Sequence, residues 1–109
     1  MSEVVVVVLA RAKPGRAEEG LAAYSALAAA THAEDGCIAF ALHHEPADPE
    51  RIVLVERWTT RPALDAHLQM PHLAEFRQAS ADLWAEPAVI MVLDPVASGD
   101  PAKGLLSGG

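Results

Sequence analysis

The sequence predicts an α+β domain in which two strand–helix–strand units share one antiparallel sheet. Runs of β-branched residues alternate with Ala- and Glu-rich segments in the order strand, helix, strand, strand, helix, strand. The two halves also repeat one feature, because each passes from a strand into a helix at a proline, within 11–15 and within 59–63. With right-handed crossovers this order gives the ferredoxin-like split fold, a four-stranded antiparallel sheet with both helical regions on one face.

The first half predicts a strand, a helix and a second strand. The valine-rich run 4–11 ends before a turn signal at 13–15. The helix that follows should end at 35–36, since glycine accepts the left-handed conformation that closes helices. The second strand is expected over 37–45. The buried face of the helix is marked by Leu21, Tyr24, Leu27, Ala28 and Thr31.

The second half predicts a third strand, two short helices and a fourth strand. A polar connection over 46–50 leads to a strand over 52–58, and Thr60 is the expected N-cap of the next helix. Pro71 should interrupt that helix, because proline disfavours helical geometry at the residue before it and suits the first turn of a new helix. The last strand is expected over 88–93.

The predicted strands are apolar on both faces, although both helical regions cover the same face. A sheet with one face in water shows alternating polar residues. Here both the odd- and the even-numbered positions are apolar in three of the predicted strands, over 4–9, 52–55 and 89–93. An identical sheet from a second copy is the simplest cover. We therefore predict a homodimer, open to further assembly, with the two sheets packed face to face.

Composition and charge limit the function classes. The 109 residues suit one domain over 1–95, followed by a flexible tail over 96–109 that has little to bury. A formal net charge of −7 argues against binding to nucleic acids or anionic membranes. The single cysteine, Cys37, forms no intrachain disulfide. Without a positively charged leader or an apolar run of membrane-spanning length, the sequence predicts a cytoplasmic protein.

A motif begins at the end of the third predicted strand. It reads Glu56-Arg57-Trp58, then Ala63-Leu64-x-x-His67-Leu68, then Pro71-His72-Leu73 and Phe76. This motif resembles the antibiotic biosynthesis monooxygenase family, most closely its quinol monooxygenase members, and the resemblance covers about residues 4–95. It implies a dimeric α+β barrel of ferredoxin-like subunits that oxidises quinols, anthrones or related phenols with dioxygen, without flavin, haem or metal.

Two histidines are the candidate catalytic residues for such chemistry. His67 or His72 would remove a proton from the substrate, because imidazole titrates near neutral pH and is a suitable general base. His67 could equally be a hydrogen-bonded structural histidine, and the position of His72 at a helix start favours a structural or capping role. The other candidates would form apolar walls around a flat aromatic substrate or orient its oxygens. These substrate-binding candidates are Trp58, Phe76, Tyr24, Arg57 and Glu56.

The sequence shows no cofactor motif. It contains no Gly-x-Gly-x-x-Gly fingerprint and no phosphate-binding loop. His67 and His72 are five residues apart, which places them on different sides of a continuous helix rather than together as metal ligands. His43 and His44 are adjacent on a strand and point to opposite faces. We therefore expect neither a cofactor nor a metal.

Three other functions compete with the monooxygenase reading. Relatives on the same barrel that degrade haem use an asparagine on the first strand, a tryptophan in the second helical region and a later haem-ligating histidine. This chain has valines, His67 and Phe76-Arg77 near those positions, so haem degradation is not expected. An isomerase of a small polar metabolite and a non-catalytic, stress-associated binding dimer are the remaining alternatives.

Overall fold

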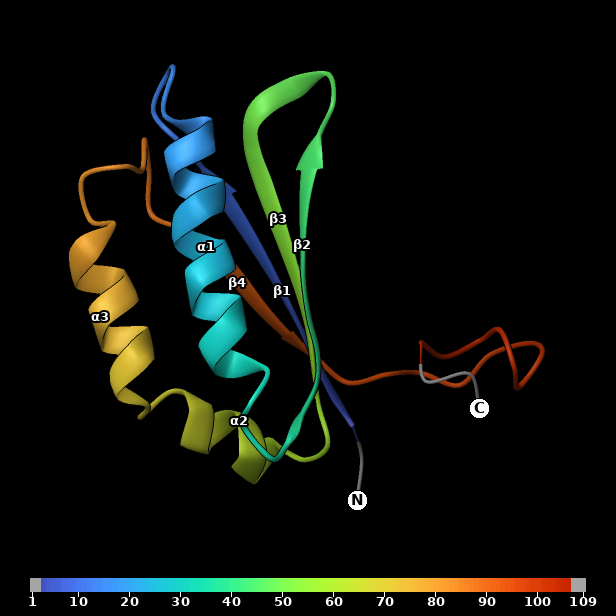
Figure 1. Ribbon diagram of the computed structural model, residues 1–109. Helices are drawn as coiled ribbons and strands as arrows, with labels where there is room; N and C mark the ends of the chain where they lie inside the picture. Colours follow the sequence, from blue (N-terminus) through green and yellow to red (C-terminus); the bar gives the residue numbers. More distant parts are fainter. Residues whose placement is uncertain (1–2, 107–109) are drawn as a thin grey trace.

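The computed structural model describes residues 3–106 and has the predicted ferredoxin-like architecture (Figure 1). The four strands form one antiparallel sheet in the order β2-β3-β1-β4. All three helices lie against the same face of this sheet (Figure 1). The elements are β1 (Val4–Arg11), α1 (Ala17–Thr31), β2 (Cys37–Glu45), β3 (Asp48–Trp58), α2 (Arg61–His67), α3 (Pro71–Ala79) and β4 (Val89–Leu93).

The register of the sheet decides which side chains meet the helices. The central strand β1 pairs with β3 and β4, so that Val7 lies opposite both Val55 and Met91. Alternate residues of β1, such as Val6 and Val8, are buried beneath the helices. Val7 and its cross-strand neighbours point to the other face, because successive side chains of a strand alternate between faces.

Strand β3 is longer than its apolar run predicts. It begins at Asp48 rather than at Ile52, so the expected connection over 46–50 is a tight hairpin. The polar residues at the start of β3 contact the end of β1, outside the hydrophobic core. The Asp48 carboxylate accepts a hydrogen bond from the Arg11 guanidinium at 2.7 Å, and the amide of Ala12 donates to the Glu50 carbonyl at 2.9 Å. Hydrophobic patterning misses this part of the strand because it buries little.

The two short helices follow the predicted signals. The Thr60 side chain accepts a hydrogen bond from the amide of Ala63 at 3.2 Å, which confirms it as the N-cap of α2. Met70 has an extended backbone, with φ −72° and ψ 140°, and Pro71 occupies the first turn of α3. The change of direction between α2 and α3 therefore lies at the residue before the proline, as expected.

Gly36 has a different role from the one predicted. Helix α1 ends at Thr31 with His32 in a right-handed conformation, and Gly36 is not among the described glycines with positive φ. The expected left-handed stop at Gly36 is therefore wrong. A Cβ atom at Gly36 would instead overlap the side chain of Ala63 on α2, so the position requires glycine because two segments approach closely.

The face of the sheet opposite the helices is apolar, and none of the three helices covers it (Figure 1). Val5, Val7 and Leu9 of β1 lie on it, beside Val89, Met91 and Leu93 of β4, which are between 38% and 48% exposed. The expected tail over 96–109 lies partly outside the described residues, and residues 96–106 contain turns but neither helix nor strand. Between residues 3 and 106, no helix is long and apolar enough to cross a membrane.

The close approach at Gly36 predicts a specific stability defect. Gly36→Ala should lower the free energy of unfolding by about 1–3 kcal/mol, because overpacking forces the turn away from α2. Ala63→Gly alone should cost about 1 kcal/mol of helix propensity. Chemical denaturation should then show that the double variant loses less free energy of unfolding than the two single variants lose together. Strictly additive losses would contradict the contact between Gly36 and Ala63.

Candidate functional site

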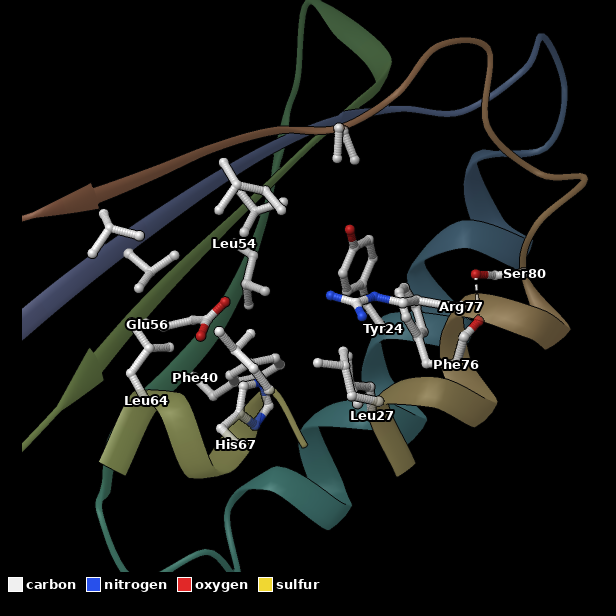
Figure 2. A pocket seen from close by; sticks show the side chains of 18 of the residues that line it. Tyr24, Leu27, Phe40, Leu54, Glu56, Leu64, His67, Phe76, Arg77 and Ser80 are labelled. Carbon is white, nitrogen blue, oxygen red and sulfur yellow. Dashed lines mark hydrogen bonds between the residues drawn. The ribbon is translucent and has the colours of Figure 1, made fainter. Parts of the chain in front are cut away.

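A cavity of about 270 Å³ lies between the helices and the sheet (Figure 2). Its floor consists of side chains from the helix-facing side of all four strands, and its roof comes from α1, α2 and α3. The lining is predominantly apolar, as expected for a site that binds a small organic molecule. Lining side chains include Val6, Val8, Leu27, Phe40, Leu54, Leu64, Leu73, Ile90 and Val92.

Three aromatic rings form one end of the cavity. The Tyr24 ring lies 4.6 Å from the Phe76 ring and 5.4 Å from the Trp84 ring, measured between centroids. The indole nitrogen of Trp84 donates to the Ser80 hydroxyl at 3.3 Å. Burial, followed by the charge of Glu56, raises the pKa of Tyr24 to about 12, so its hydroxyl is a neutral donor at physiological pH.

A buried carboxyl group, Glu56, lines the same cavity (Figure 2). Its Oε1 accepts a hydrogen bond from the indole nitrogen of Trp58 at 2.9 Å. Burial raises the pKa of Glu56 above its ordinary value, while the Trp58 hydrogen bond and the nearby His67 oppose that rise. The cavity thus contains a carboxyl group that is easier to protonate than an exposed glutamate.

His67 is the histidine that lines the cavity. Only 2% of the residue is exposed. The centroid of its ring lies 4.6 Å from that of the Trp58 ring and 5.9 Å from that of the Phe40 ring. Its Nδ1 donates to Oε2 of Glu34 at 2.8 Å. In a neutral ring the other nitrogen, Nε2, is then an acceptor, and it has no hydrogen-bond partner within residues 3–106.

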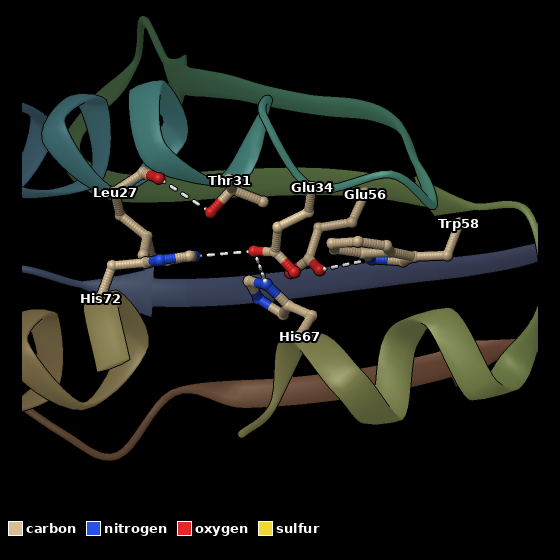
Figure 3. Close-up of polar contacts among 7 residues, drawn as sticks. All are labelled: Leu27, Thr31, Glu34, Glu56, Trp58, His67 and His72. Carbon is tan, nitrogen blue, oxygen red and sulfur yellow. Dashed lines mark hydrogen bonds and ion pairs between the residues drawn. The ribbon is translucent and has the colours of Figure 1, made fainter. Parts of the chain in front are cut away.

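Glu34 also binds the second histidine (Figure 3). Nε2 of His72 donates to the same carboxylate oxygen at 2.7 Å. The expectation that a spacing of five residues keeps the two histidines apart is wrong, because the chain is extended at Met70 and the rings come from two separate helices. Glu34, His67 and His72 are consequently a set of side chains able to hold a metal ion.

The predicted site residues divide into two groups. His67, Glu56, Tyr24 and Phe76 line the cavity. The other three do not line it, and they have different surroundings. Trp58 is fully buried behind His67, and His72 lies on the far side of Glu34. Arg57 pairs with Glu3 at 2.6 Å and belongs, by its position in β3, to the face opposite the helices.

Sequence reasoning missed three residues. Glu34 lies in the turn after α1, where no periodicity indicates the direction of a side chain. Trp84 lies beyond the end of α3 and folds back onto Tyr24. Arg77 lines the cavity from the exposed side of α3, and its guanidinium points toward Tyr24 (Figure 2). Within the described chain, Arg77 makes no ion pair.

Comparison with known proteins identifies the family. The model of the antibiotic biosynthesis monooxygenase family matches residues 3–79. The chain belongs to this family. It is 35% identical to Rv0793 of Mycobacterium tuberculosis over 95 residues, which are 87% of this chain and 93% of that protein.

Solved structures of similar proteins have the same fold, and a further relative is similar in sequence. The structure of Rv0793 has a TM-score of 0.82 and 30% identity, with coverage of 91% of this chain and 100% of that one. PA3566 of Pseudomonas aeruginosa also has a TM-score of 0.82, with 27% identity and coverage of 89% and 97%. The Synechocystis protein sll1783 is 33% identical over 89 residues, 82% of this chain, and this chain spans only 60% of that relative's length.

The raised pKa of Glu56 predicts that stability depends on pH at this position. Glu56→Gln should increase the free energy of unfolding at pH 7, because ionisation of a buried carboxyl group opposes folding while glutamine still accepts from Trp58. This gain should shrink as the pH falls to the point where the carboxyl is protonated in both states. Denaturation curves across pH measure it, with Glu75→Gln on the exposed side of α3 as the matched control. The raised pKa of Glu56 would be contradicted if Glu56→Gln gained the same free energy of unfolding at every pH. It would also be contradicted if Glu75→Gln showed the same dependence on pH.

Proposed function

We propose that this family member is a cofactor-independent monooxygenase that oxidises a quinol, anthrone or similar phenolic aromatic with dioxygen. The family description supports monooxygenase activity in general, and the substrate class rests on the cavity. The observation that carries the proposal is a buried imidazole, His67, with one ring nitrogen free in the wall of an apolar cavity. The proposed reactants are therefore a small aromatic molecule and dioxygen.

The cavity would hold a flat aromatic substrate mainly through apolar contact. Phe76 and Leu64 would lie against its rings, and the Tyr24 hydroxyl would donate a hydrogen bond to a substrate oxygen. Glu56 would contact a second polar group of the substrate on the side near His67. Trp58 would act indirectly, by supporting the His67 ring and holding Glu56.

Proton transfer would be the contribution of His67. Nε2 would take the proton of the phenolic hydroxyl, and Glu34 would fix the tautomer and stabilise the imidazolium that forms. Of the two predicted bases, the cavity favours His67, because His72 does not line it. His72 would position Glu34 through its hydrogen bond to the same oxygen.

The substrate would supply the electrons. A phenolate can transfer one electron to dioxygen, and recombination of the two radicals would form a carbon–oxygen bond and a peroxide anion. The His67 imidazolium would return its proton to this anion, which gives a hydroperoxide and restores the neutral ring. Loss of water would then leave one oxygen atom on the ring system, as a carbonyl in an anthrone or a hydroxyl on the quinone formed from a quinol. All four electrons come from the substrate, so no external reductant is required. The apolar walls would exclude water during these steps.

We further propose that two chains form a homodimer in the cytoplasm. The apolar sheet face opposite the helices supports this assembly, because a face of this kind is covered in a stable protein. Packing two sheets face to face would bury Val5, Val7 and Leu9 of each copy. The cavity lies on the helix side, so each copy would keep its own site.

The role of His67 predicts a large loss of activity. His67→Gln should reduce kcat for oxygen uptake with anthrone- or menadiol-type substrates by about 10²- to 10⁴-fold, the usual contribution of a general base. His72→Gln should reduce it less, and His44→Gln, on the exposed end of β2, should not change it. Unchanged uptake in a His67/His72 double variant would defeat the assignment. Ligand binding without oxygen uptake across a broad phenol panel would favour the non-catalytic dimer.

The dimer proposal predicts a change of molecular mass. Light scattering after size-exclusion chromatography should give twice the 11.5 kDa mass of the chain for the wild type. Val7→Asp should give a monomer or an insoluble protein, because it places a charge in the centre of the apolar face. Gln78→Glu, on the exposed side of α3, adds one negative charge and should leave the dimer intact. A monomeric wild type would refute the proposal.

A further inference from the structure

We propose that Glu34, His67 and His72 form a binding site for a divalent transition-metal cation, of which Zn²⁺ is the representative. The three ligand atoms, one from each side chain, all lie within 4.8 Å of one another. They come from the turn after α1, from α2 and from α3, so a cation would join three separate segments beside the cavity. Neither the family description nor the proposed oxidation requires this site.

Convergence of the two imidazoles is the first observation behind this site. Nδ1 of His67 and Nε2 of His72 both point at one oxygen of Glu34, at 2.8 and 2.7 Å (Figure 3). A ring nitrogen directs its lone pair along the line on which it otherwise directs a hydrogen. Exchange of tautomer in each ring would therefore aim two lone pairs at a common point, as metal binding requires.

The environment of Glu34 is the second observation. Its side chain is only 8% exposed, and within residues 3–106 its charge is paired with neither lysine nor arginine. Buried carboxylates are normally paired with a cation or coordinate a metal. A divalent cation between Glu34 and the two rings would compensate this negative charge.

The donor set determines the class of cation. Two imidazole nitrogens and one carboxylate oxygen suit Zn²⁺, Co²⁺ and Ni²⁺, whereas Mg²⁺ and Ca²⁺ prefer oxygen ligands. Three protein ligands leave a fourth position for water, as in open zinc sites. His72 has a 23% exposed side chain, so solvent reaches the site from its side.

Binding requires a small rearrangement. Zinc bonds to nitrogen and oxygen are about 2.0–2.2 Å long, so the cation would occupy the region between the rings and the Glu34 carboxylate would withdraw. Glu34 can do this more easily than a helical residue, because it lies in the turn between α1 and β2. The two histidines can keep their places on α2 and α3.

Occupation of the site would also change the chemistry of the cavity. A cation on Nδ1 of His67 moves the ring hydrogen to Nε2, which then donates hydrogen bonds and no longer accepts a proton. Zn²⁺ should therefore inhibit the oxidation. This consequence rests on the proposed function, whereas the binding of the cation does not.

Direct binding measurements test the site without reference to activity. Isothermal titration of chelator-treated protein with Zn²⁺ should show one site per chain, and Co²⁺ should give visible absorption bands of a nitrogen-ligated ion. His72→Gln should weaken Zn²⁺ binding at least about 100-fold, because losing a residue that only orients a ligand already costs about 10- to 100-fold. Mg²⁺ should not compete. The matched control is the double variant His43→Gln/His44→Gln, which removes the adjacent histidines of β2 and should bind as the wild type does.

Several results would overturn the site. The first is that the wild type binds no Zn²⁺. The second is that His72→Gln binds Zn²⁺ with the affinity of the wild type. The third is that the His43→Gln/His44→Gln variant loses Zn²⁺ binding while His72→Gln keeps it. If far-UV circular dichroism shows that His72→Gln is unfolded, Glu34→Gln takes its place with the same expected loss. The two proposals can fail separately. If Zn²⁺ binds with the expected variant pattern but the protein takes up no oxygen with any phenol, the metal site stands and the proposed oxidation fails. If the protein takes up oxygen, binds no Zn²⁺ and is not inhibited by it, the oxidation stands and the metal site fails.

Discussion

The hydrogen bonds from two histidines to one buried carboxylate oxygen organise this molecule. Glu34 fastens the turn after α1 to both short helices, through His67 of α2 and His72 of α3. The same bond to His67 fixes which ring nitrogen carries hydrogen. The roof of the cavity and the chemistry of its imidazole therefore depend on a single side chain.

This arrangement exists because the helical region is broken. In a continuous helix, residues five apart lie on different sides, and the two rings would not meet. The extended backbone at Met70 and the start of α3 at Pro71 reorient the second ring toward Glu34. Gly36 contributes from the other side, because the absence of a side chain lets the turn that carries Glu34 approach Ala63. A proline and a glycine thus help to set the geometry of the Glu34, His67 and His72 side chains.

The fold was largely predictable from the sequence, because it depends on patterns that are local. Periodicity and punctuation gave the element order, the Thr60 cap and the break at Pro71, and all three are confirmed. The start of β3 at Asp48 was missed, since polar residues that pair at the end of a sheet bury too little to show a pattern. The stop at Gly36 was misread, because close approach and left-handed geometry both require glycine.

The site was less predictable, because it depends on where side chains point. Sequence reasoning was enough to suggest His67, Glu56, Tyr24 and Phe76, which line the cavity. Arg57 was assigned from its neighbours in the motif, but strand alternation places it on the opposite face with Glu3. Glu34 and Trp84 lie in irregular segments, where neither a period of 3.6 nor a period of 2 fixes the direction of a side chain.

The tautomer of His67 is the property on which the proposed chemistry depends most directly. Long-range proton–nitrogen NMR correlation of the imidazole rings in the metal-free protein measures it at neutral pH. The structure predicts a hydrogen on Nδ1 and a lone pair on Nε2. Glu34→Ala removes the acceptor of that hydrogen, so Nδ1 should no longer be the preferred position of the hydrogen in this variant. A hydrogen on Nε2 in the wild type would contradict it, because the ring would then have no base to offer the cavity.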